Sequence, residues 1–242
     1  MAGFTSRRKA DAMILDGLLT VNGNVVLDLG HKIDPRKDVV FAQGRQVSIV
    51  RESVYILLNK PKDTITTMSD ERGRSTVVDY VRSKQRVYPI GRLDRNTTGV
   101  LLLTNDGDLA NLLMHPRCEF PKAYKATLDK PLAAEHAAKL EAGIRLSDGK
   151  TRPAEIVKIQ GGKNKVIGIV IHEGKNRQVH RMFEALGYTV EKLDRVGYGN
   201  LTYDGVPRGK WRYLTTREVD TLRNVAGRDK RGEDREADPE FD

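Results

Sequence analysis

The residue best suited to chemistry in this sequence of 242 residues is Asp94, within the stretch GRLDRNTTGVLLLTNDG at residues 91–107. It stands a few residues before an apolar run at 100–103 that is typical of a buried strand. A carboxylate in a short loop beside such a strand is held rigidly, as a reacting group requires. Arg92 and Arg95 flank it and favour the ionised form. Asp94 is therefore a candidate nucleophile, or else a loop carboxylate that pairs with one of these arginines or caps a turn.

Other patterns that imitate known binding sites do not fit them. The calcium-loop pattern that starts at Asp94 has Asn105 at its twelfth position, where a glutamate is required. The stretch GIRLSDGKT at 143–151 has five residues between its glycines, and a phosphate-binding loop has four. One cysteine, Cys118, and five scattered histidines provide no metal-ligand pattern. We therefore expect neither a metal site nor a nucleotide site.

Several strands and helices must position Asp94. Residues 54–59 (VYILLN) are expected to form a buried strand that ends at Lys60 and Pro61, and residues 100–103 a second one. Asp108 is expected to cap a helix at 109–114. The other expected elements are a strand at 124–128, a helix at 133–142, strands at 156–159 and 166–171 joined by a turn at Gly161 and Gly162, and a strand at 189–193.

A second informative stretch is HEGKNRQVHRMFEALGYTV at residues 172–190. Its apolar residues recur at i, i+3, i+4 and i+7 from Val179, so one side of a helix is expected to be buried. Arg177 and Arg181 lie on another side, and Gly187 is suited to end the helix.

The N-terminal fifty residues predict a small separate module. A helix is expected to start after Thr5 and Ser6 with the basic residues Arg7, Arg8 and Lys9, which form either an RNA contact or a solvated face. A hairpin at 19–26 around Asn-Gly and a strand near 38–41 follow.

The charge balance favours an anionic partner. The chain carries a net charge of +9, and residues 226–242 hold four basic and seven acidic side chains, so the basic surplus lies in the rest of the chain. A folded basic body of this kind most often binds nucleic acid. We expect a cytoplasmic monomer with no membrane partner, because the sequence contains no spanning segment, no signal peptide and only one cysteine.

The N-terminal module resembles the RNA-binding domain named after small-subunit ribosomal protein S-four, through SRRK at residues 6–9 and VNG at 21–23. The resemblance covers about residues 3–48. Such domains usually begin with another helix, so this one is expected to be shortened at its start.

The rest of the chain resembles pseudouridine synthases of the RsuA type, which act on ribosomal RNA. GRLD and NTTGVLLLTNDGDL carry the resemblance, supported by LLNKPKD at 57–63, KAY at 122–124 and EGKNRQVHRM at 173–182. The resemblance implies an α+β catalytic domain with a mixed, mainly antiparallel sheet. We expect an S-four-like domain at 1–51, the catalytic domain at 52–225 and a disordered charged tail at 226–242.

This resemblance implies isomerisation of a uridine in RNA to pseudouridine without metal or organic cofactor. The catalytic aspartate of the family corresponds to Asp94, and its tyrosine, expected against the flipped uracil, corresponds to Tyr124. Arg92 is expected to contact the flipped nucleotide or its phosphate. The family places an arginine or lysine beside the aspartate where this chain has His180, so His180, Arg177 or Arg181 is expected to fill that role.

The sequence does not name the uridine. Residues 109–117 (LANLLMHPR) and the GKNRQ segment favour large-subunit ribosomal RNA, free or within a pre-ribosomal particle, as the partner. The alternative is a non-catalytic RNA-binding or ribosome-assembly protein on the same fold, against which Asp94 and Tyr124 argue.

Overall fold

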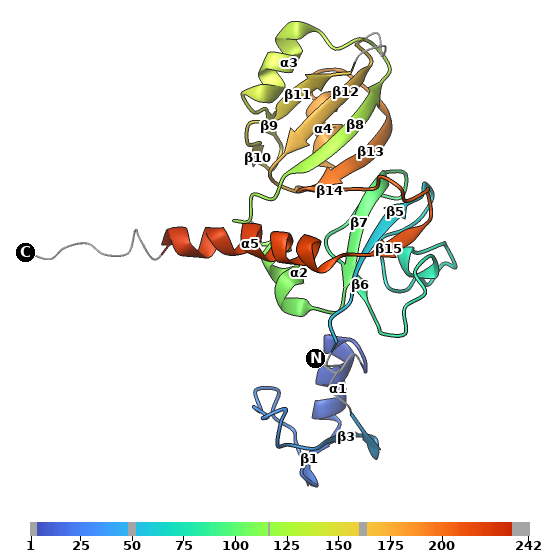
Figure 1. The fold of residues 1–242 in the computed structure, drawn as a ribbon, viewed down its shortest axis with the longest axis vertical. Helices are drawn as coiled ribbons and strands as arrows, with labels where there is room; N and C mark the ends of the chain where they lie inside the picture. Colours follow the sequence, from blue (N-terminus) through green and yellow to red (C-terminus); the bar gives the residue numbers. More distant parts are fainter. Residues whose placement is uncertain (1–3, 48–51, 116, 160–163, 234–242) are drawn as a thin grey trace, which may run out of the picture. The chain divides into compact units, whose positions relative to one another are not determined.

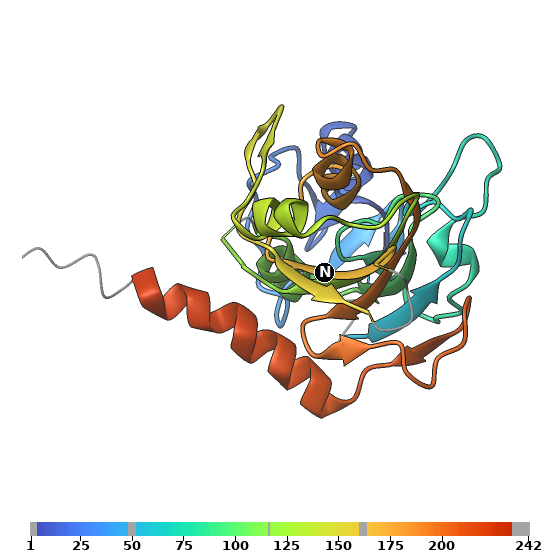
Figure 2. The same ribbon diagram turned by 90° about the horizontal axis from the view of Figure 1, so that it is seen from above.

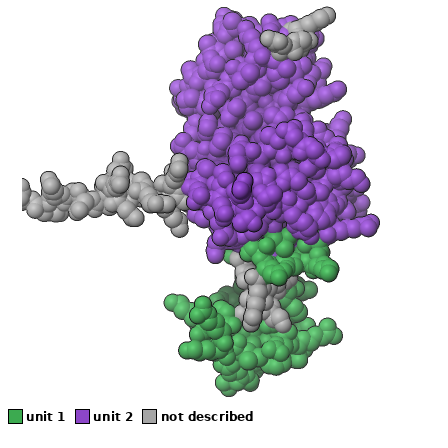
Figure 3. All heavy atoms as spheres, viewed as in Figure 1, with its two compact units in different colours: residues 1–54, 83–86 green, residues 55–82, 87–242 purple. Residues whose placement is uncertain are grey.

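The chain divides into two compact units, which Figure 3 shows in different colours. The computed structural model describes residues 4–47, 52–115, 117–159 and 164–233. The first unit comprises Met1–Val54 and Ser83–Arg86, and the second comprises Tyr55–Arg82 and Val87–Asp242. The sequence-based boundary at residue 51 therefore omitted the segment Ser83–Arg86. In that segment the Arg86 guanidinium donates a hydrogen bond to the Thr5 carbonyl at 3.1 Å.

The first unit is one helix and a four-stranded sheet. Its elements are α1 (Arg7–Leu15), β1 (Leu19–Val21), β2 (Asn24–Val25), β3 (Val40–Ala42) and β4 (Arg45–Gln46), with strand order β2-β1-β3-β4. The Ser6 hydroxyl caps α1 by accepting a hydrogen bond from the Lys9 amide. Asn22 and Gly23 both have positive φ, as the tight β1–β2 turn requires. Among the described residues of this unit, the buried apolar side chains are Met13 and Ala42, so its core is small.

A nine-stranded sheet forms the frame of the second unit (Figure 1). Its strands are β5 (Tyr55–Lys60), β6 (Tyr88–Pro89), β7 (Thr98–Thr104), β8 (Lys122–Leu128), β11 (Glu155–Lys158), β12 (Val166–Ile171), β13 (Val190–Tyr198), β14 (Leu201–Thr202) and β15 (Trp211–Tyr213). The main order is β11-β12-β8-β13-β7-β5-β15, with β14 beside β13 and β6 beside β7. Strands β13 and β7 are parallel, and the other paired strands of this sheet are antiparallel. The predicted α+β class with a mixed, mainly antiparallel sheet is confirmed.

The remaining elements of the second unit are short except for the last helix. They are the 3-10 turn η1 (Val77–Asp79), α2 (Gly107–Met114), α3 (Ala134–Glu141), the β9 (Arg145–Leu146) and β10 (Gly149–Lys150) hairpin, α4 (Gln178–Glu184) and α5 (Thr216–Glu233). The predicted cap of α2 was wrong, because the Asp106 carboxylate accepts from the amides of Asp108 and Leu109.

Two sequence-based expectations concern ends and turns of the second unit. The disordered tail expected at 226–242 is wrong for residues 226–233, which continue α5 to Glu233. Arginine, lysine and alanine in this segment have good helix propensity, which favours continuation of the helix. Residues 234–242 and the expected turn at Gly161 and Gly162 lie outside the described residues.

The core of the second unit lies between the sheet and α2. Leu57 on β5 and Val100 and Leu102 on β7 belong to one buried cluster with Leu109 and Leu113 of α2. Helix α5 packs beside α2 (Figure 1). The Asp94 loop, between β6 and β7, therefore leads directly into β7, one of the most buried strands of the sheet.

Strand β13 is longer than the sequence indicated, running to Tyr198 instead of ending at Leu193. Its Arg195 pairs in register with Gly99 at the start of β7. Gly99 has φ 105°, and a Cβ added there would lie 2.2 Å from the Arg195 carbonyl oxygen. Glycine at this position therefore allows β13 to approach the end of the Asp94 loop.

Candidate active site

A cleft of about 760 Å³ opens in the second unit around Asp94. Its walls come from the loop before β7, from β8 and β13, and from the segment that leads into α4. The cleft brings together five of the residues predicted from sequence: Asp94, Tyr124, His180, Arg92 and Arg177.

The Asp94 loop is fixed from below by a buried lysine. Lys60, at the end of β5, has no exposed surface, and its ammonium donates to the carbonyls of Pro61, Asp94, Arg95 and Thr97 at 2.8–3.2 Å. Burial lowers the pKa of Lys60 to about 8, partly opposed by the negative charge of Asp94. The group remains protonated at neutral pH, so its N–H donors serve the carbonyls of the loop and of Pro61.

Neighbouring contacts complete the support of this loop. The Thr66 hydroxyl donates to the Leu93 carbonyl at 2.7 Å and accepts from the Leu93 amide at 3.2 Å. Arg95 pairs with Asp63 at 2.6 Å, so this arginine does not serve the Asp94 carboxylate as the sequence had suggested. These contacts hold the backbone on both sides of Asp94.

His180 is the side chain of α4 that approaches the Asp94 carboxylate. Its Nδ1 lies 3.9 Å from Asp94 Oδ2, too far for a hydrogen bond, and this buried nitrogen has no hydrogen-bond partner in the described structure. Burial, followed by the charge of Arg177, lowers the pKa of His180, and the charge of Asp94 partly opposes this. The imidazole is therefore neutral at neutral pH.

The two arginines that were alternatives to His180 are engaged with other carboxylates. Arg181 forms two hydrogen bonds of 2.9 Å to Asp148, between β9 and β10, and does not line the cleft. Figure 2 shows α4 and this hairpin on the same side of the sheet. Arg177 lines the cleft but pairs with Glu184 at 3.4 Å.

Tyr124 forms part of the cleft wall on β8. It is buried, and it pairs in register with Arg195 on the neighbouring β13. Side chains of directly paired residues lie on the same face of a sheet. A ring entering the cleft would therefore meet the Tyr124 ring and the Arg195 guanidinium together.

Three lysine and arginine residues of the site were missed by sequence reasoning: Lys60, Lys122 and Arg195. Lys122 was visible as the first residue of KAY, but only its tyrosine was assigned a role. Arg195 was missed because the strand was expected to end at Leu193. Burial lowers the pKa of Lys122 to about 8, and the charge of Arg195 acts in the same direction. Burial also disfavours the charged form of Tyr198, which is the deprotonated one, and so raises the pKa of its hydroxyl to about 12.

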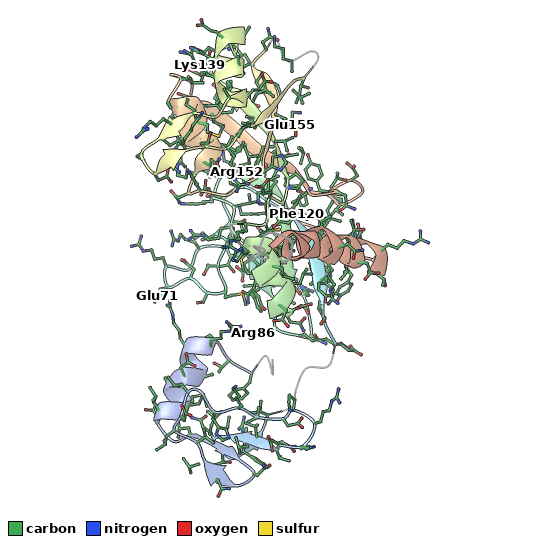
Figure 4. All side chains as sticks on the ribbon, turned by 90° about the vertical axis from the view of Figure 1, so that its left-hand side faces the viewer. Glu71, Arg86, Phe120, Lys139, Arg152 and Glu155 are labelled. Carbon is green, nitrogen blue, oxygen red and sulfur yellow. The ribbon has the colours of Figure 1, made fainter. Side chains whose placement is uncertain are left out.

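The mouth of the cleft carries further polar groups. Arg152 forms an ion pair with Glu119, and its backbone amide donates to Glu173 at 3.0 Å. Figure 4 labels Arg152 between Phe120 and Glu155. Glu173 also accepts a hydrogen bond from Gln178 at 2.6 Å, which ties the segment before α4 to the wall of the cleft.

The basic residues predicted on the first unit are all at its surface. Arg7, Arg8 and Lys9 are exposed in the first turn of α1. The part of the chain that the structure describes contains no cluster of His, Cys, Asp and Glu able to hold a metal. None of its helices is long and apolar enough to cross a membrane.

Comparisons with known proteins match both units. The model of the RNA pseudouridylate synthase family matches residues 54–185, and that of the S4 domain matches residues 1–40. Ribosomal large subunit pseudouridine synthase B of Bacillus subtilis (strain 168) is 46% identical over 233 residues, which cover 95% of each chain. The protein of that name from Vibrio cholerae is 37% identical over 93% of this chain and 72% of its own length. A crystal structure of a pseudouridylate synthase has a TM-score of 0.68 and 28% identity, covering 90% of this chain and 94% of that one.

Proposed function

We propose that this chain, which belongs to the RNA pseudouridylate synthase family, isomerises a uridine of large-subunit ribosomal RNA to pseudouridine. RNA pseudouridine synthases are isomerases, and the chain is therefore an isomerase. The observation that carries the proposal is the position of the Asp94 carboxylate. It lies on a loop held by hydrogen bonds and lines a cleft together with Tyr124 and His180. The relatives that share the name ribosomal large subunit pseudouridine synthase B favour the large-subunit RNA.

In the proposed reaction Asp94 acts as the nucleophile. Its carboxylate either attacks the ribose C1′ or acts through a glycal route, and in both cases the bond from C1′ to uracil N1 breaks. The uracil turns within the cleft, and C5 bonds to C1′. In the first route this breaks the bond from C1′ to Asp94, and in the glycal route C2′ regains the proton that Asp94 removed. The C5 proton then leaves and N1 gains a proton. The product has the same atoms as the substrate, so no oxidant or reductant is needed.

Other cleft residues have proposed roles that follow from their positions. Tyr124, buried in the wall, lies against the uracil and assists the movement of the C5 proton. Arg92, exposed at the cleft, contacts the flipped nucleotide or its phosphate. His180, the group nearest the Asp94 carboxylate among the three alternatives, orients it. Arg177 in the cleft lining and Arg181 outside it contribute positive charge for RNA.

The target uridine must leave its stack to reach Asp94. Flipping a base costs a few kcal/mol, which contacts to the base and to backbone phosphates offset. The exposed Arg7, Arg8 and Lys9 on α1 are suited to such phosphate contacts. We propose that the chain acts in the cytoplasm, as a monomer with no membrane partner, on ribosomal RNA as its substrate. Light scattering at micromolar concentration tests the monomer.

The substitution Asp94→Asn tests the proposed chemistry. We expect it to abolish tritium release from unmodified large-subunit ribosomal RNA labelled at uracil C5, because an amide is not an effective nucleophile, while RNA affinity stays within about twofold. Asp108→Asn, on the exposed start of α2, is the matched control and should retain full turnover. Retained turnover in Asp94→Asn would refute the assignment. Absence of turnover in the unmodified protein, with tight RNA binding, would favour a non-catalytic assembly factor.

A second experiment identifies the substrate. Pseudouridines are mapped in ribosomal RNA from cells with and without the gene for this protein. We expect at least one position in the large-subunit RNA to lose its modification. Loss confined to small-subunit or transfer RNA would contradict the proposed substrate and leave the reaction class intact.

A further inference from the structure

Two cations of the cleft wall, the buried Arg195 and the half-buried Lys122, lie on neighbouring strands, and no acidic side chain forms a described ion pair with either of them. Lys122 on β8 and Arg195 on β13 both line the cleft. In the described part of the chain neither has an ion-pair partner. Burial of unpaired positive charge is costly, so such groups are retained where a ligand supplies the negative charge.

Arg195 is fixed and incompletely bonded. Its side chain is held by a 2.7 Å hydrogen bond from Nε to the Val100 carbonyl, and the residue is only 3% exposed. Its buried Nη2 has no hydrogen-bond partner. A guanidinium presents its N–H groups in a rigid fork, so anchoring Nε also fixes the direction of Nη2. This unused donor belongs to a residue of the cleft wall.

Lys122 completes the pair from the neighbouring strand. Its ammonium donates to the Phe120 carbonyl at 2.9 Å and lies 5.8 Å from the centre of the Tyr198 ring. The Arg195 guanidinium lies 5.0 Å from the same centre. The Tyr198 hydroxyl stays protonated at neutral pH, because burial raises its pKa to about 12, so it supplies no negative charge. The aromatic face holds both cations without neutralising them.

The isomerisation generates an anion in this cleft. When the bond between N1 and C1′ breaks, the electron pair remains on uracil, and the negative charge spreads over N1, O2 and O4. The charge disappears when C5 bonds to C1′, the C5 proton leaves and N1 is protonated. Fixed donors directed at a charge that exists only during the reaction are an effective form of catalysis.

We infer that Lys122 and Arg195 form a cationic niche that receives the detached uracil and donates hydrogen bonds to its carbonyl oxygens while the ring is anionic. The inference rests on the proposed function, whose nucleophile is Asp94. The niche lowers the barrier to glycosidic cleavage and retains the free base during its rotation. It assigns catalytic roles to two residues besides Asp94 and Tyr124.

A backbone phosphate fits this place less well than the base. Arg195 is almost fully buried and pairs in register with Tyr124, the residue proposed to lie against the uracil. Phosphates of the RNA chain remain outside when a base flips. Exposed arginines such as Arg92 are accessible to them without burial of the backbone.

The substitution Lys122→Met tests the niche in the full chain. We expect the single-turnover rate on unmodified large-subunit ribosomal RNA to fall about 100-fold, a typical effect of removing one fixed donor to a developing anion. RNA affinity should change less than about threefold, and Lys122→Arg should recover most of the rate. The matched control is Lys125→Met, on the same strand with an exposed side chain, which should react normally. Thermal melts establish that each variant is folded.

A second substrate separates anion stabilisation from a structural effect. RNA made with 5-fluorouridine has a better leaving group, since fluorine stabilises the uracil anion. The rate of loss of the N-linked nucleoside, measured by nuclease digestion and chromatography, should fall less in Lys122→Met with this RNA than with uridine RNA. Arg195→Lys, which keeps the charge but replaces the guanidinium fork with a single ammonium, should show the same difference, with thermal melts to confirm that it is folded.

Three outcomes overturn the inference. They are an unchanged rate in Lys122→Met, a loss explained entirely by weaker RNA binding, or equal rate losses for uridine and 5-fluorouridine. Each requires an active unmodified protein that Asp94→Asn inactivates. Inactivity of the unmodified protein would instead refute the proposed function.

Discussion

Asp94 is held by its backbone, and its carboxylate is left available. The Asp94 carbonyl accepts from Lys60 and from the Thr97 amide at 3.1 Å each. The imidazole of His180, which approaches the carboxylate, lies beyond hydrogen-bond distance, and the Asp94 side chain is 36% exposed. Contacts to the main chain thus fix the position of Asp94 and leave its carboxylate oxygens open to the cleft.

The imidazole at position 180 gives a prediction about pH. His180 is neutral at neutral pH, because burial and Arg177 lower its pKa, and it gains a proton only as the pH falls below the ordinary histidine value of 6.5. If a positive charge beside Asp94 promotes turnover, His180→Arg should be faster at pH 8 by up to about 10-fold, which is the gain from one charged contact. This advantage should shrink as the pH falls and the native His180 becomes charged.

Single-turnover rates of both proteins from pH 5 to 8 measure this ratio, in which the titration of other groups cancels. His180→Gln, which stays neutral, is the control, and its deficit relative to the native protein should grow as the pH falls. A ratio that is constant with pH would exclude His180 as the partner of Asp94. The free energy of unfolding should decrease as the pH falls below 6.5. The lowered pKa of His180 in the folded protein means that the unfolded chain binds this proton more tightly.

At the scale of elements, the end of β5 supports the Asp94 loop. We expect Lys60→Met to lower the free energy of unfolding by about 3 kcal/mol, because three carbonyls of the loop and that of Pro61 lose their shared donor. Turnover should fall further than stability predicts, since Asp94 loses its fixed position. Urea denaturation and single-turnover rates provide the two measurements.

Lys62→Met is the matched control for this prediction. Lys62 lies two residues beyond Lys60 and its side chain is exposed, so its loss removes the same charge without removing the support. Equal effects of the two substitutions on turnover would mean that the charge of this segment matters and the support of the loop does not.

The sequence predicted elements better than it predicted the surroundings of Asp94. Apolar runs identified β5 and β7, and the Asn22-Gly23 pair identified the β1–β2 turn, because both are local signals. The roles of Lys60 and Arg195 depend on contacts between segments distant in the chain, and a charged residue near a strand end gives no local sign of burial. The family motifs directed attention to the positions of Asp94, Tyr124 and His180, but spacing could not distinguish His180 from the neighbouring arginines.

The domain division shows the same limit on a larger scale. The segment Ser83–Arg86 follows an element of the second unit in sequence, yet it belongs to the first unit in the structure. Its contact with Thr5 joins residues about eighty positions apart. Composition cannot reveal that Ser83–Arg86 belongs to the first unit, because this segment has the length and residue types of an ordinary loop.

At the scale of the whole molecule, basic residues for RNA occur on both units. The cleft of the second unit has Arg92 and Arg177 in its lining, and α1 of the first unit exposes Arg7, Arg8 and Lys9. Binding to phosphates and chemistry on the base are therefore separable in principle. Contacts to phosphates change affinity and its salt dependence, whereas contacts to the reacting base change the rate.

The basic turn of α1 provides the test of this separation. We expect the triple substitution of Arg7, Arg8 and Lys9 to alanine to weaken RNA binding strongly at physiological salt. The slope of log affinity against log salt should become shallower by about 2 to 3, because each lost phosphate contact removes about 0.7 to 0.9. The single-turnover rate at saturating protein should change less than about twofold, since Asp94 and its cleft are intact.

The control replaces three other exposed lysines with alanine: Lys139 on α3, Lys158 on β11 and Lys192 on β13, all outside the cleft lining. This variant loses the same charge and should leave the slope nearly unchanged. Equal slopes for the two triple variants would show that net charge alone, and not α1, determines binding.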